Sequence, residues 1–413
     1  MRRRSGVLLH ALALALFVSS APKAQEAQGA QVAVRGETVY TMAGPPISDG
    51  VVLIRNGKIE RVGPASRVTI PNGFRVLTAK VVTPGLIDAH TVVGIAGYLN
   101  QPNDQEQLEA SAPMQPELNA MDAYDAREPL VEWLREFGIT TIHTGHSPGA
   151  LISGRTMIVK TRGNNVDEAV LVPEAMVAAT LGDSARAEKE KPPGTRAKMV
   201  AMLRTEFIKA QEYLDKTTSD EEEDKPDRDL RLEVFARMLN RELPLLVTAQ
   251  RSQDILTAIR LAKEFDIRLV LDGAAESYLV TDQIRASGYP VILHPTMYRS
   301  GGETENLTME AASRLKAADI PFALQSGYEA YVPKTRVVLF EAALAAANGL
   351  SFEDALASIT VDAARLLGID DRVGSLESGK DGDVALYDGD PFEYTSHCVG
   401  TVIDGEVVSE AVR

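Results

Sequence analysis

The sequence is poor in the residues from which cross-links and many active sites are built. One cysteine, Cys398, and six histidines occur among 413 residues, and aromatic residues make up 5% of the chain. A single cysteine cannot form an internal disulfide framework, so the fold must be stabilised by its apolar core. No GxGxxG or phosphate-loop motif occurs, so nothing favours an open nucleotide-binding sheet. The remaining composition, 45% apolar and 24% charged, is that of an ordinary globular protein.

Positive charge is also scarce, with 43 Lys and Arg against 58 Asp and Glu and a net charge of −15. The N-terminus resembles a signal peptide, because Arg2–Arg4 precede the apolar run Val7–Val18 and small residues continue to Ala24. Removal of residues 1–24 takes away four basic residues and no acidic ones, which brings the net charge to −19. We predict an exported, periplasmic or extracellular protein, with no membrane span after cleavage and no nucleic-acid partner.

Both ends of the chain carry the pattern of β-hairpins. Two short apolar runs flank Asn56-Gly57 near the N-terminus, and two more flank Asp404-Gly405 near the C-terminus. Asn-Gly and Asp-Gly are strong signals of two-residue hairpin turns. We predict that residues 25–81 and 381–413 pack together as one composite β-sandwich.

The middle of the chain, residues 82–380, alternates short apolar runs with helical patterns. Such alternation indicates parallel strands joined by crossover helices, and its length favours an α/β fold with a (β/α)8 TIM barrel. Residues 183–232 interrupt the pattern with two charged runs around a helical stretch at 196–214. We interpret this segment as a surface excursion with an acidic tip, and the alternative is a lid over the barrel mouth.

Two motifs at the ends of the middle region resemble the amidohydrolase superfamily. The first is PGLIDAH at Pro84–His90, where a strand ends. The second spans residues 355–383, where a final helix leads into the GSLESG of Gly374–Gly379. The likeness is greatest to the imidazolonepropionase-like branch and covers roughly residues 35–410. It implies a metal-dependent hydrolase acting on carbon–nitrogen bonds other than peptide bonds.

The resemblance also implies where metal ligands should stand. The first strand of the family ends in His-x-His, because alternate residues of a strand point to the same side, but here it reads His90-Thr91-Val92. Further ligand positions on the middle, fifth, sixth and eighth strands hold Ala178, Thr248, Asp272 and Gln325. A catalytic zinc needs about three protein ligands. The comparison with the family pattern therefore predicts a degenerate metal site.

Other histidines follow candidate strands. His143 and His146 stand in and after one strand, and His294 ends another. Because the carboxyl ends of barrel strands form the active-site face, these histidines and His90 could rebuild a site for one divalent metal such as zinc. The alternative is that each histidine caps its strand or satisfies a loop carbonyl. Lys160, by contrast, alternates as an exposed strand residue would.

Three functions stay open at this point. The first is a carbon–nitrogen hydrolase that keeps some activity through an altered or single-metal site. The second is a catalytically inactive barrel that binds a small molecule or a partner protein at its mouth, and the third is a structural subunit of an exported complex. A homodimer is compatible with each of them, and no cofactor beyond the metal is expected. The candidate residues at the barrel mouth are His90, His143, His146, Thr248, Asp272, His294 and Gln325.

Overall fold

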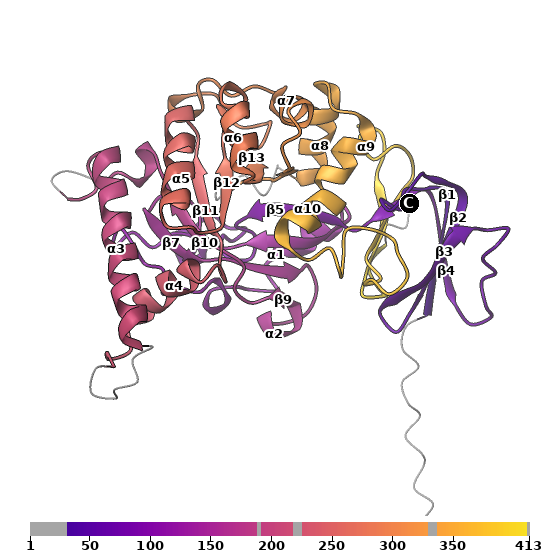
Figure 1. The fold of residues 1–413 in the computed structure, drawn as a ribbon. Helices are drawn as coiled ribbons and strands as arrows, with labels where there is room; N and C mark the ends of the chain where they lie inside the picture. Colours follow the sequence, from indigo (N-terminus) through magenta and orange to yellow (C-terminus); the bar gives the residue numbers. More distant parts are fainter. Residues whose placement is uncertain (1–30, 188–190, 218–224, 329–336, 411–413) are drawn as a thin grey trace, which may run out of the picture.

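The computed structural model describes residues 31–187, 191–217, 225–328 and 337–410 as a mixed α/β fold (Figure 1). The α/β class predicted from the sequence is therefore confirmed. Strands from the two chain ends lie together at one side of the molecule, next to the helical middle region. The predicted signal peptide, residues 1–24, falls outside the described residues. Within the described residues, no helix is long and apolar enough to cross a membrane.

Seven strands from both chain ends form one sheet. They are β1 (Gln31–Val39), β2 (Ile47–Arg55), β3 (Lys58–Pro64), β4 (Arg75–Pro84), β15 (Val384–Tyr387), β16 (Cys398–Ile403) and β17 (Glu406–Glu410). Their order is β17-β16-β15-β4-β1-β2-β3, so the two chain ends meet where β4 pairs antiparallel with β15. The predicted turn residues Asn56 and Gly57 both have positive φ, as a two-residue hairpin requires. Packing of these strands as a two-layer sandwich stays a prediction.

Alternation gives this sheet two apolar faces. Val34 and Val52 belong to one buried cluster, and their neighbours Ala33 and Val51 belong to another. All four side chains are fully buried. A slip of one residue would exchange the two faces, so burial on both sides helps to fix the register of the strands.

The middle of the chain adds two further sheets. The first contains, in order, β14 (Phe322–Leu324), β13 (Val291–Leu293), β12 (Leu269–Gly273), β11 (Leu245–Ala249), β10 (Val177–Thr180) and β7 (Ile152–Arg155). The second contains β5 (Leu86–Thr91), β6 (Ile139–Thr144), β8 (Met157–Lys160) and β9 (Val170–Val172). An isolated parallel bridge between Thr91 and Gly327 joins the ends of β5 and β14. Closure of these strands into an eight-stranded barrel stays a prediction.

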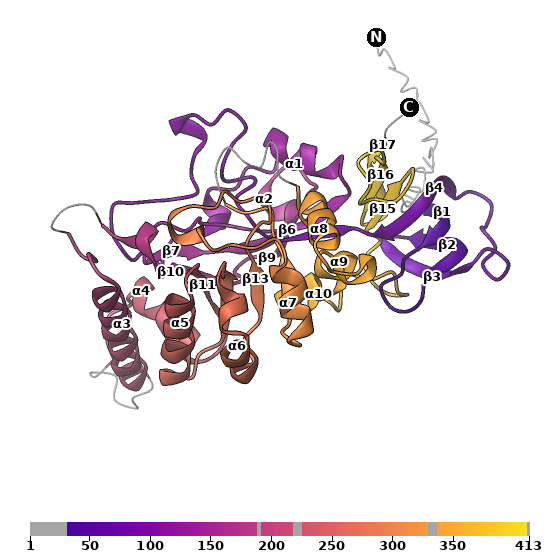
Figure 2. The same ribbon diagram turned by 90° about the horizontal axis from the view of Figure 1, so that it is seen from above.

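Helices follow the parallel strands. The main ones are α1 (Pro129–Arg135), α5 (Ser252–Glu264), α6 (Thr281–Ser287), α7 (Ala311–Ala317), α8 (Val338–Ala347), α9 (Phe352–Ser358) and α10 (Val361–Leu367), with a short α2 (Val166–Ala169). Figure 2 shows α5 and α6 next to each other on one side of the strands. Short 3-10 turns lie at Pro102–Asp104, Ala120–Asp122, Asp183–Ala185, Ser277–Leu279 and Gly302–Thr304.

The charged segment 183–232 is only partly a surface excursion. Its helix α3 (Arg196–Thr217) covers the predicted helical stretch and buries Phe207 in the main core. Phe207 stacks on Phe265 with ring centroids 4.7 Å apart and meets Phe235 of α4 (Leu230–Leu239) edge-on at 5.0 Å. The predicted acidic tip falls mostly outside the described residues. Much of this segment therefore belongs to the core. The sequence did not indicate this, because charged runs lie on either side of the helix.

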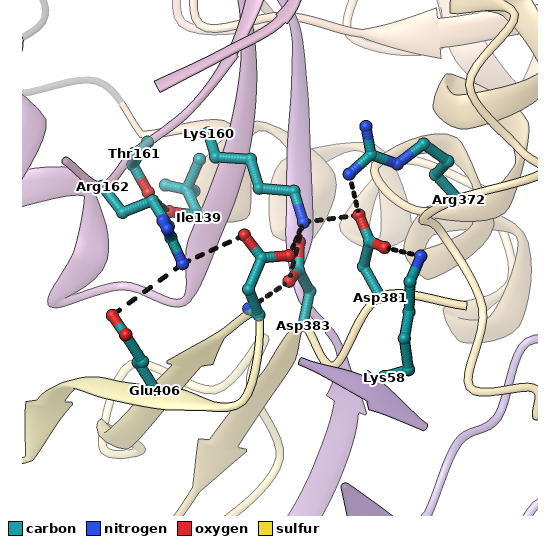
Figure 3. Close-up of polar contacts among 10 residues, drawn as sticks. Lys58, Ile139, Lys160, Thr161, Arg162, Arg372, Asp381, Asp383 and Glu406 are labelled. Atoms are coloured by element: carbon teal, nitrogen blue, oxygen red, sulfur yellow. Dashed lines mark hydrogen bonds and ion pairs between the residues drawn. The ribbon is translucent and has the colours of Figure 1, made fainter. Parts of the chain in front are cut away.

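Lys160 is buried, which corrects the prediction that it is exposed. Its side chain is 4% exposed, and its Nζ lies 2.7 Å from Asp381 Oδ2 and 3.2 Å from Asp383 Oδ1 (Figure 3). Nζ also pairs with Asp404. The alternation argument failed because both faces of β8 are covered, so all four residues of this strand are buried.

The ion pairs around Lys160 connect β8 to the sheet at the chain ends (Figure 3). We call this group the junction cluster, and it consists of Lys58, Lys160, Arg162, Arg372, Asp381, Asp383, Asp404 and Glu406. Its four cations balance its four carboxylates. Burial lowers the pKa of Lys160, but Asp383, Asp404 and Asp381 outweigh burial and hold that pKa above its ordinary value. Lys160 is therefore cationic at neutral pH although it is buried.

Candidate functional site

Four neighbouring strands bring polar side chains to one edge of the six-stranded sheet. Their buried apolar residues Leu246, Val270, Ile292 and Ala323 share one cluster, which also contains residues of α10. Alternate residues of a strand lie on the same side. Two positions further along, on that same side, stand Thr248, Asp272, His294 and Gln325, all of them buried. The register of β11 and β12 places Thr248 directly beside Asp272.

Asp272 is the centre of a hydrogen-bonded group that we call the strand-end network, which consists of His90, Thr248, Asp272 and Gln325. His90 Nδ1 and Gln325 Nε2 each lie 2.9 Å from Asp272 Oδ1, and the Thr248 hydroxyl donates to Asp272 Oδ2 at 2.5 Å. Burial raises the pKa of the Asp272 carboxyl, but His90, Thr248 and Gln325 outweigh burial and hold that pKa below its ordinary value. The structure thus brings four of the seven candidate residues into direct contact.

Two atoms of the strand-end network have no hydrogen-bond partner among the described residues. A carboxylate only accepts hydrogen bonds, so His90 donates to Asp272 through Nδ1. His90 Nε2, on the other side of the ring, is buried and has no partner. Gln325 donates through Nε2, and its Oε1 is likewise buried without a partner. The network therefore gives both oxygens of Asp272 a donor while it leaves other polar atoms unused.

His143 lies against the network rather than within it. Its ring stacks on that of His90, with centroids 5.5 Å apart. Nδ1 donates to the Ala89 carbonyl at 2.7 Å, which leaves Nε2 to accept from the Thr156 hydroxyl at 2.6 Å. Burial, and next the nearby His90, lower the pKa of His143 to about 3. His143 is therefore neutral at physiological pH, and neither ring nitrogen is left for a metal.

His146 and His294 are not joined to the network by a hydrogen bond among the described residues. His294 Nδ1 donates to the Pro295 carbonyl at 2.9 Å, and its Nε2 is buried without a partner. Neither ring nitrogen of His146 has a partner, and burial and then the charge of Arg155 lower the pKa of His146 to about 4. Of the four histidines predicted at the mouth, only His90 and His143 contact each other through their rings.

Asp88 is a chemical group that the sequence reasoning passed over. Its Oδ1 accepts the backbone N–H groups of Ser326 at 3.0 Å and His90 at 3.3 Å, while Oδ2 has no partner. Burial raises the pKa of the Asp88 carboxyl from 3.8 to about 7. The available signal was a carboxylate inside the otherwise apolar PGLIDAH motif.

Ser147 stands at the centre of residues 145–149, GHSPG, which have the G-x-S-x-G spacing of a serine-hydrolase elbow. Its hydroxyl donates to the Pro148 carbonyl at 3.3 Å, and the adjacent His146 has no hydrogen-bond partner. The segment continues as a bend and not as a helix. The serine therefore lacks both the base and the strand–turn–helix setting of a nucleophile.

A cavity of about 210 Å³ lies beside the strand-end network. Thr248 belongs to both, since its side chain lines the cavity and its hydroxyl donates to Asp272. Gln250 and Tyr328 also line the cavity, where Gln250 Nε2 donates to the Tyr328 hydroxyl at 3.0 Å. The Tyr328 ring lies 5.8 Å from that of His90. Gln250 and Tyr328 were not predicted, although both follow strand ends, and that position was the available signal.

The potential metal ligands do not gather at one point. Among the described residues, no group of three His, Cys, Asp or Glu side chains is placed to hold a metal ion. Val92 and Ala178 are buried apolar residues at the positions where the family pattern has ligands. Both oxygens of Asp272 already accept hydrogen bonds from protein groups.

Comparisons with known proteins agree with the motifs. Residues 309–409 match the model of the amidohydrolase family. The imidazolonepropionase of Caulobacter sp. (strain K31) is 26% identical over 361 residues, which cover 83% of this chain and 88% of that protein. The amidohydrolase tasK of Hapsidospora irregularis is 24% identical over 402 residues, but this chain spans only 39% of its length.

Solved structures agree as well. The crystal structure of an amidohydrolase from Thermotoga maritima MSB8 is 28% identical, with a TM-score of 0.87, and the match covers 92% of this chain and 100% of that one. The resemblance to the amidohydrolase superfamily, and to its imidazolonepropionase-like branch, that the two motifs predicted is confirmed.

Proposed function

We propose that this amidohydrolase-family protein binds a small molecule at its strand ends and does not carry out the metal-dependent hydrolysis of its family. The observation behind this proposal is the use of Asp272, which stands where the family pattern has a metal-binding histidine. Its carboxylate accepts from His90, Thr248 and Gln325, so protein donors already use three of its about four acceptor sites. Without a metal, the pKa of water stays near ~15.7 instead of falling towards ~7, and water remains a poor nucleophile.

The cavity supports a binding role over a purely structural one. It lies at the carboxyl ends of the parallel strands, where barrel and sheet proteins of this class bind their ligands. Thr248 connects it to the strand-end network, so a ligand in the cavity would touch a hydroxyl whose proton is held by Asp272. A structural subunit would need neither the cavity nor the unpartnered polar atoms beside it.

A hydrolase with an altered or single-metal site is the second candidate function. His90 favours it, because this residue occupies a family ligand position and its buried Nε2 has no hydrogen-bond partner. On this alternative the protein acts on carbon–nitrogen bonds other than peptide bonds, as its family does. Asp272 would then reach the metal through Oδ2, which accepts only from Thr248.

Metal content distinguishes the two functions. The mature protein, purified without chelators, is analysed by plasma mass spectrometry together with His90→Ala and, as a control, the exposed His397→Ala. The proposal expects metal far below one ion per chain in all three proteins. Near-stoichiometric zinc that only His90→Ala removes would establish the hydrolase alternative and contradict the proposal.

The proposal includes an architecture and a location. Residues 82–380 form the barrel, residues 25–81 and 381–413 form the composite domain, and residues 1–24 direct export and are removed. N-terminal sequencing of the protein from the periplasm or medium tests the cleavage, and light scattering tests the homodimer. A full-length chain that stays in the cytoplasm would contradict the export proposal.

A further inference from the structure

The wall of the cavity beside the strand-end network carries a carboxylate that is only partly compensated. Glu303 lines the cavity, and its side chain is 14% exposed. Its Oε1 accepts from Arg196 Nη2 at 2.9 Å, but the same guanidinium also bonds Asp254 at 2.8 Å and Asp183 at 3.0 Å. Arg186 adds one further positive charge at Asp183. Three carboxylates therefore share two guanidinium groups, and one negative charge has no cation to compensate it.

The lining of the cavity holds no compensating cation. Among the described residues that line it, none is Lys, Arg or His, and Glu303 is its one charged side chain. Burial raises the pKa of the Glu303 carboxyl and outweighs the opposing effects of a hydrogen bond from the Asp183 backbone and of the Arg196 charge. A bound anion would face this carboxylate at close range, so the wall disfavours an anionic ligand.

The hydrogen bonds of the lining residues also favour a cationic ligand over an anionic one. The single hydroxyl proton of Thr248 goes to Asp272, and that of Thr304 goes to the carbonyl groups of Arg299 and Gly301. A hydroxyl whose proton is used presents only its lone pairs. Gln250 has used its Oε1 on Ala275 N–H and donates from Nε2 to Tyr328. Thr180 is an exception, since its oxygen accepts from Gly149 N–H and keeps its proton. Thr248 and Thr304 thus present acceptors to the cavity, which a donor-rich ligand would satisfy.

Aromatic rings complete the surroundings. Tyr298 and Tyr328 both line the cavity, with ring centroids 6.3 Å apart. Cations are attracted to the faces of such rings when they lie within about 6 Å of the centroid. The volume of about 210 Å³ is smaller than most drug-sized pockets, so the ligand must be compact.

We propose that this cavity binds a small organic cation, a protonated alkylamine or an amidinium, against the rings of Tyr298 and Tyr328. The Glu303 carboxylate neutralises the positive charge, and the Thr248 and Thr304 oxygens accept its N–H groups. This inference rests on the proposed small-molecule site and names the chemical class that fits it. Thr248 then couples the occupied cavity to Asp272 and the rest of the strand-end network.

Calorimetric titration with four small probes of different charge tests the ligand class. n-Butylammonium and acetamidinium should bind, whereas n-butanol and butyrate should bind at least tenfold more weakly. Raising the salt concentration should lower the affinity for the cation, because salt screens the charge of Glu303.

Variants locate the binding. Glu303→Gln should weaken n-butylammonium binding at least tenfold, and Glu303→Asp should retain most of it because the charge is kept. Glu305→Gln, at a neighbouring carboxylate that pairs with Arg251 and is more than half exposed, is the matched control and should bind as the unmodified protein does. Thermal unfolding of each variant shows that the fold is intact.

Every outcome decides the inference. Preferential binding of butyrate or n-butanol, or an unchanged affinity in Glu303→Gln, would overturn the cation class while the small-molecule site stands. Binding of none of the probes would also overturn it. Failure of the proposed function has a different signature, which is stoichiometric metal in the content analysis and hydrolysis that depends on His90.

Discussion

The junction cluster and the strand-end network are two buried polar groups of different construction. In the junction cluster four cations meet four carboxylates, and among its side-chain atoms only Asp383 Oδ2 is buried without a partner. In the strand-end network the Asp272 carboxylate accepts hydrogen bonds from the other three side chains. His90 Nε2 and Gln325 Oε1 have no hydrogen-bond partner among the described residues. His294 Nε2 and Asp88 Oδ2 add two more unpartnered atoms on adjacent strands.

This difference separates stability from function. An unpartnered buried polar group costs about 1–3 kcal/mol, so several of them in one place indicate a role other than holding the fold together. Four unpartnered atoms belong to residues of neighbouring strand ends, His90, Gln325, His294 and Asp88, whereas the junction cluster balances its charges across two parts of the fold. We therefore expect substitutions at the junction to act mainly on folding and those at the strand ends to act also on ligand binding.

Lys160→Met tests the stabilising half of this comparison and should have the largest effect. It leaves Asp381, Asp383 and Asp404 buried without their shared cation. Breaking a buried ion pair by removing one partner costs about 3–5 kcal/mol, and urea unfolding should show a loss of this size. An unfolding midpoint equal to that of the unmodified protein would mean that the junction cluster does not stabilise the fold.

Asp272→Asn tests the other half. The amide keeps one acceptor oxygen but offers an N–H₂ group to donors that already point at it, so hydrogen bonds from His90, Gln325 or Thr248 are lost. We expect a loss of about 2–3 kcal/mol in urea unfolding, together with weaker binding of a ligand in the cavity. Asp266→Asn, at an exposed position, is the control. A variant that loses stability and keeps full binding would separate the network from the cavity.

His146 makes stability depend on pH without being part of either group. Its pKa of about 4 in the folded protein lies below the ordinary 6.5, so the folded state favours the neutral ring. The contribution of His146 is present above pH 6.5 and is lost as the pH falls towards 4. His146→Leu removes this titration, so the variant should lose roughly 2 kcal/mol less than the unmodified protein between pH 7 and pH 4.5. Parallel pH curves for the two proteins would contradict the shifted pKa.

Lys58→Met should have the smallest effect, and it refines the comparison within the junction cluster itself. Lys58 contacts Asp381 at 2.5 Å, as Lys160 does at 2.7 Å, but the Lys58 side chain is 52% exposed. Exposed ion pairs contribute about 0–1 kcal/mol, because water already solvates and screens the charge. A loss as large as that of Lys160→Met would show that burial does not set the strength of these pairs.

Much of the fold could be predicted because its signals are local. The Asn56-Gly57 turn, the helix at Arg196 and the PGLIDAH strand each depend on neighbouring residues. Lys160 was misjudged because period-two alternation shows which residues share a face but not whether that face is covered. Burial of both faces of β8 depends on strands that lie more than two hundred residues away in the sequence.

The candidate site was predictable in its positions and not in its contacts. Thr248, Asp272 and Gln325 were found because strand ends and family positions are visible in the sequence. That His90, Thr248 and Gln325 would all bond to Asp272 depends on side-chain directions at four strands. Gln250 and Tyr328 were missed because residues after a strand end enter a cavity only through the path of the loop.

The pairing of β4 with β15 has a consequence for how the protein is made. Pro84 is synthesised long before Val384, its partner in the sheet. Until β15 arrives, β4 keeps an unpaired edge, and open edges of apolar strands pair readily with other chains. Pairing across such a distance is also slow to form. Chains interrupted before residue 384 should therefore aggregate through this edge. Pairing with β15, which is synthesised much later, covers the edge of β4.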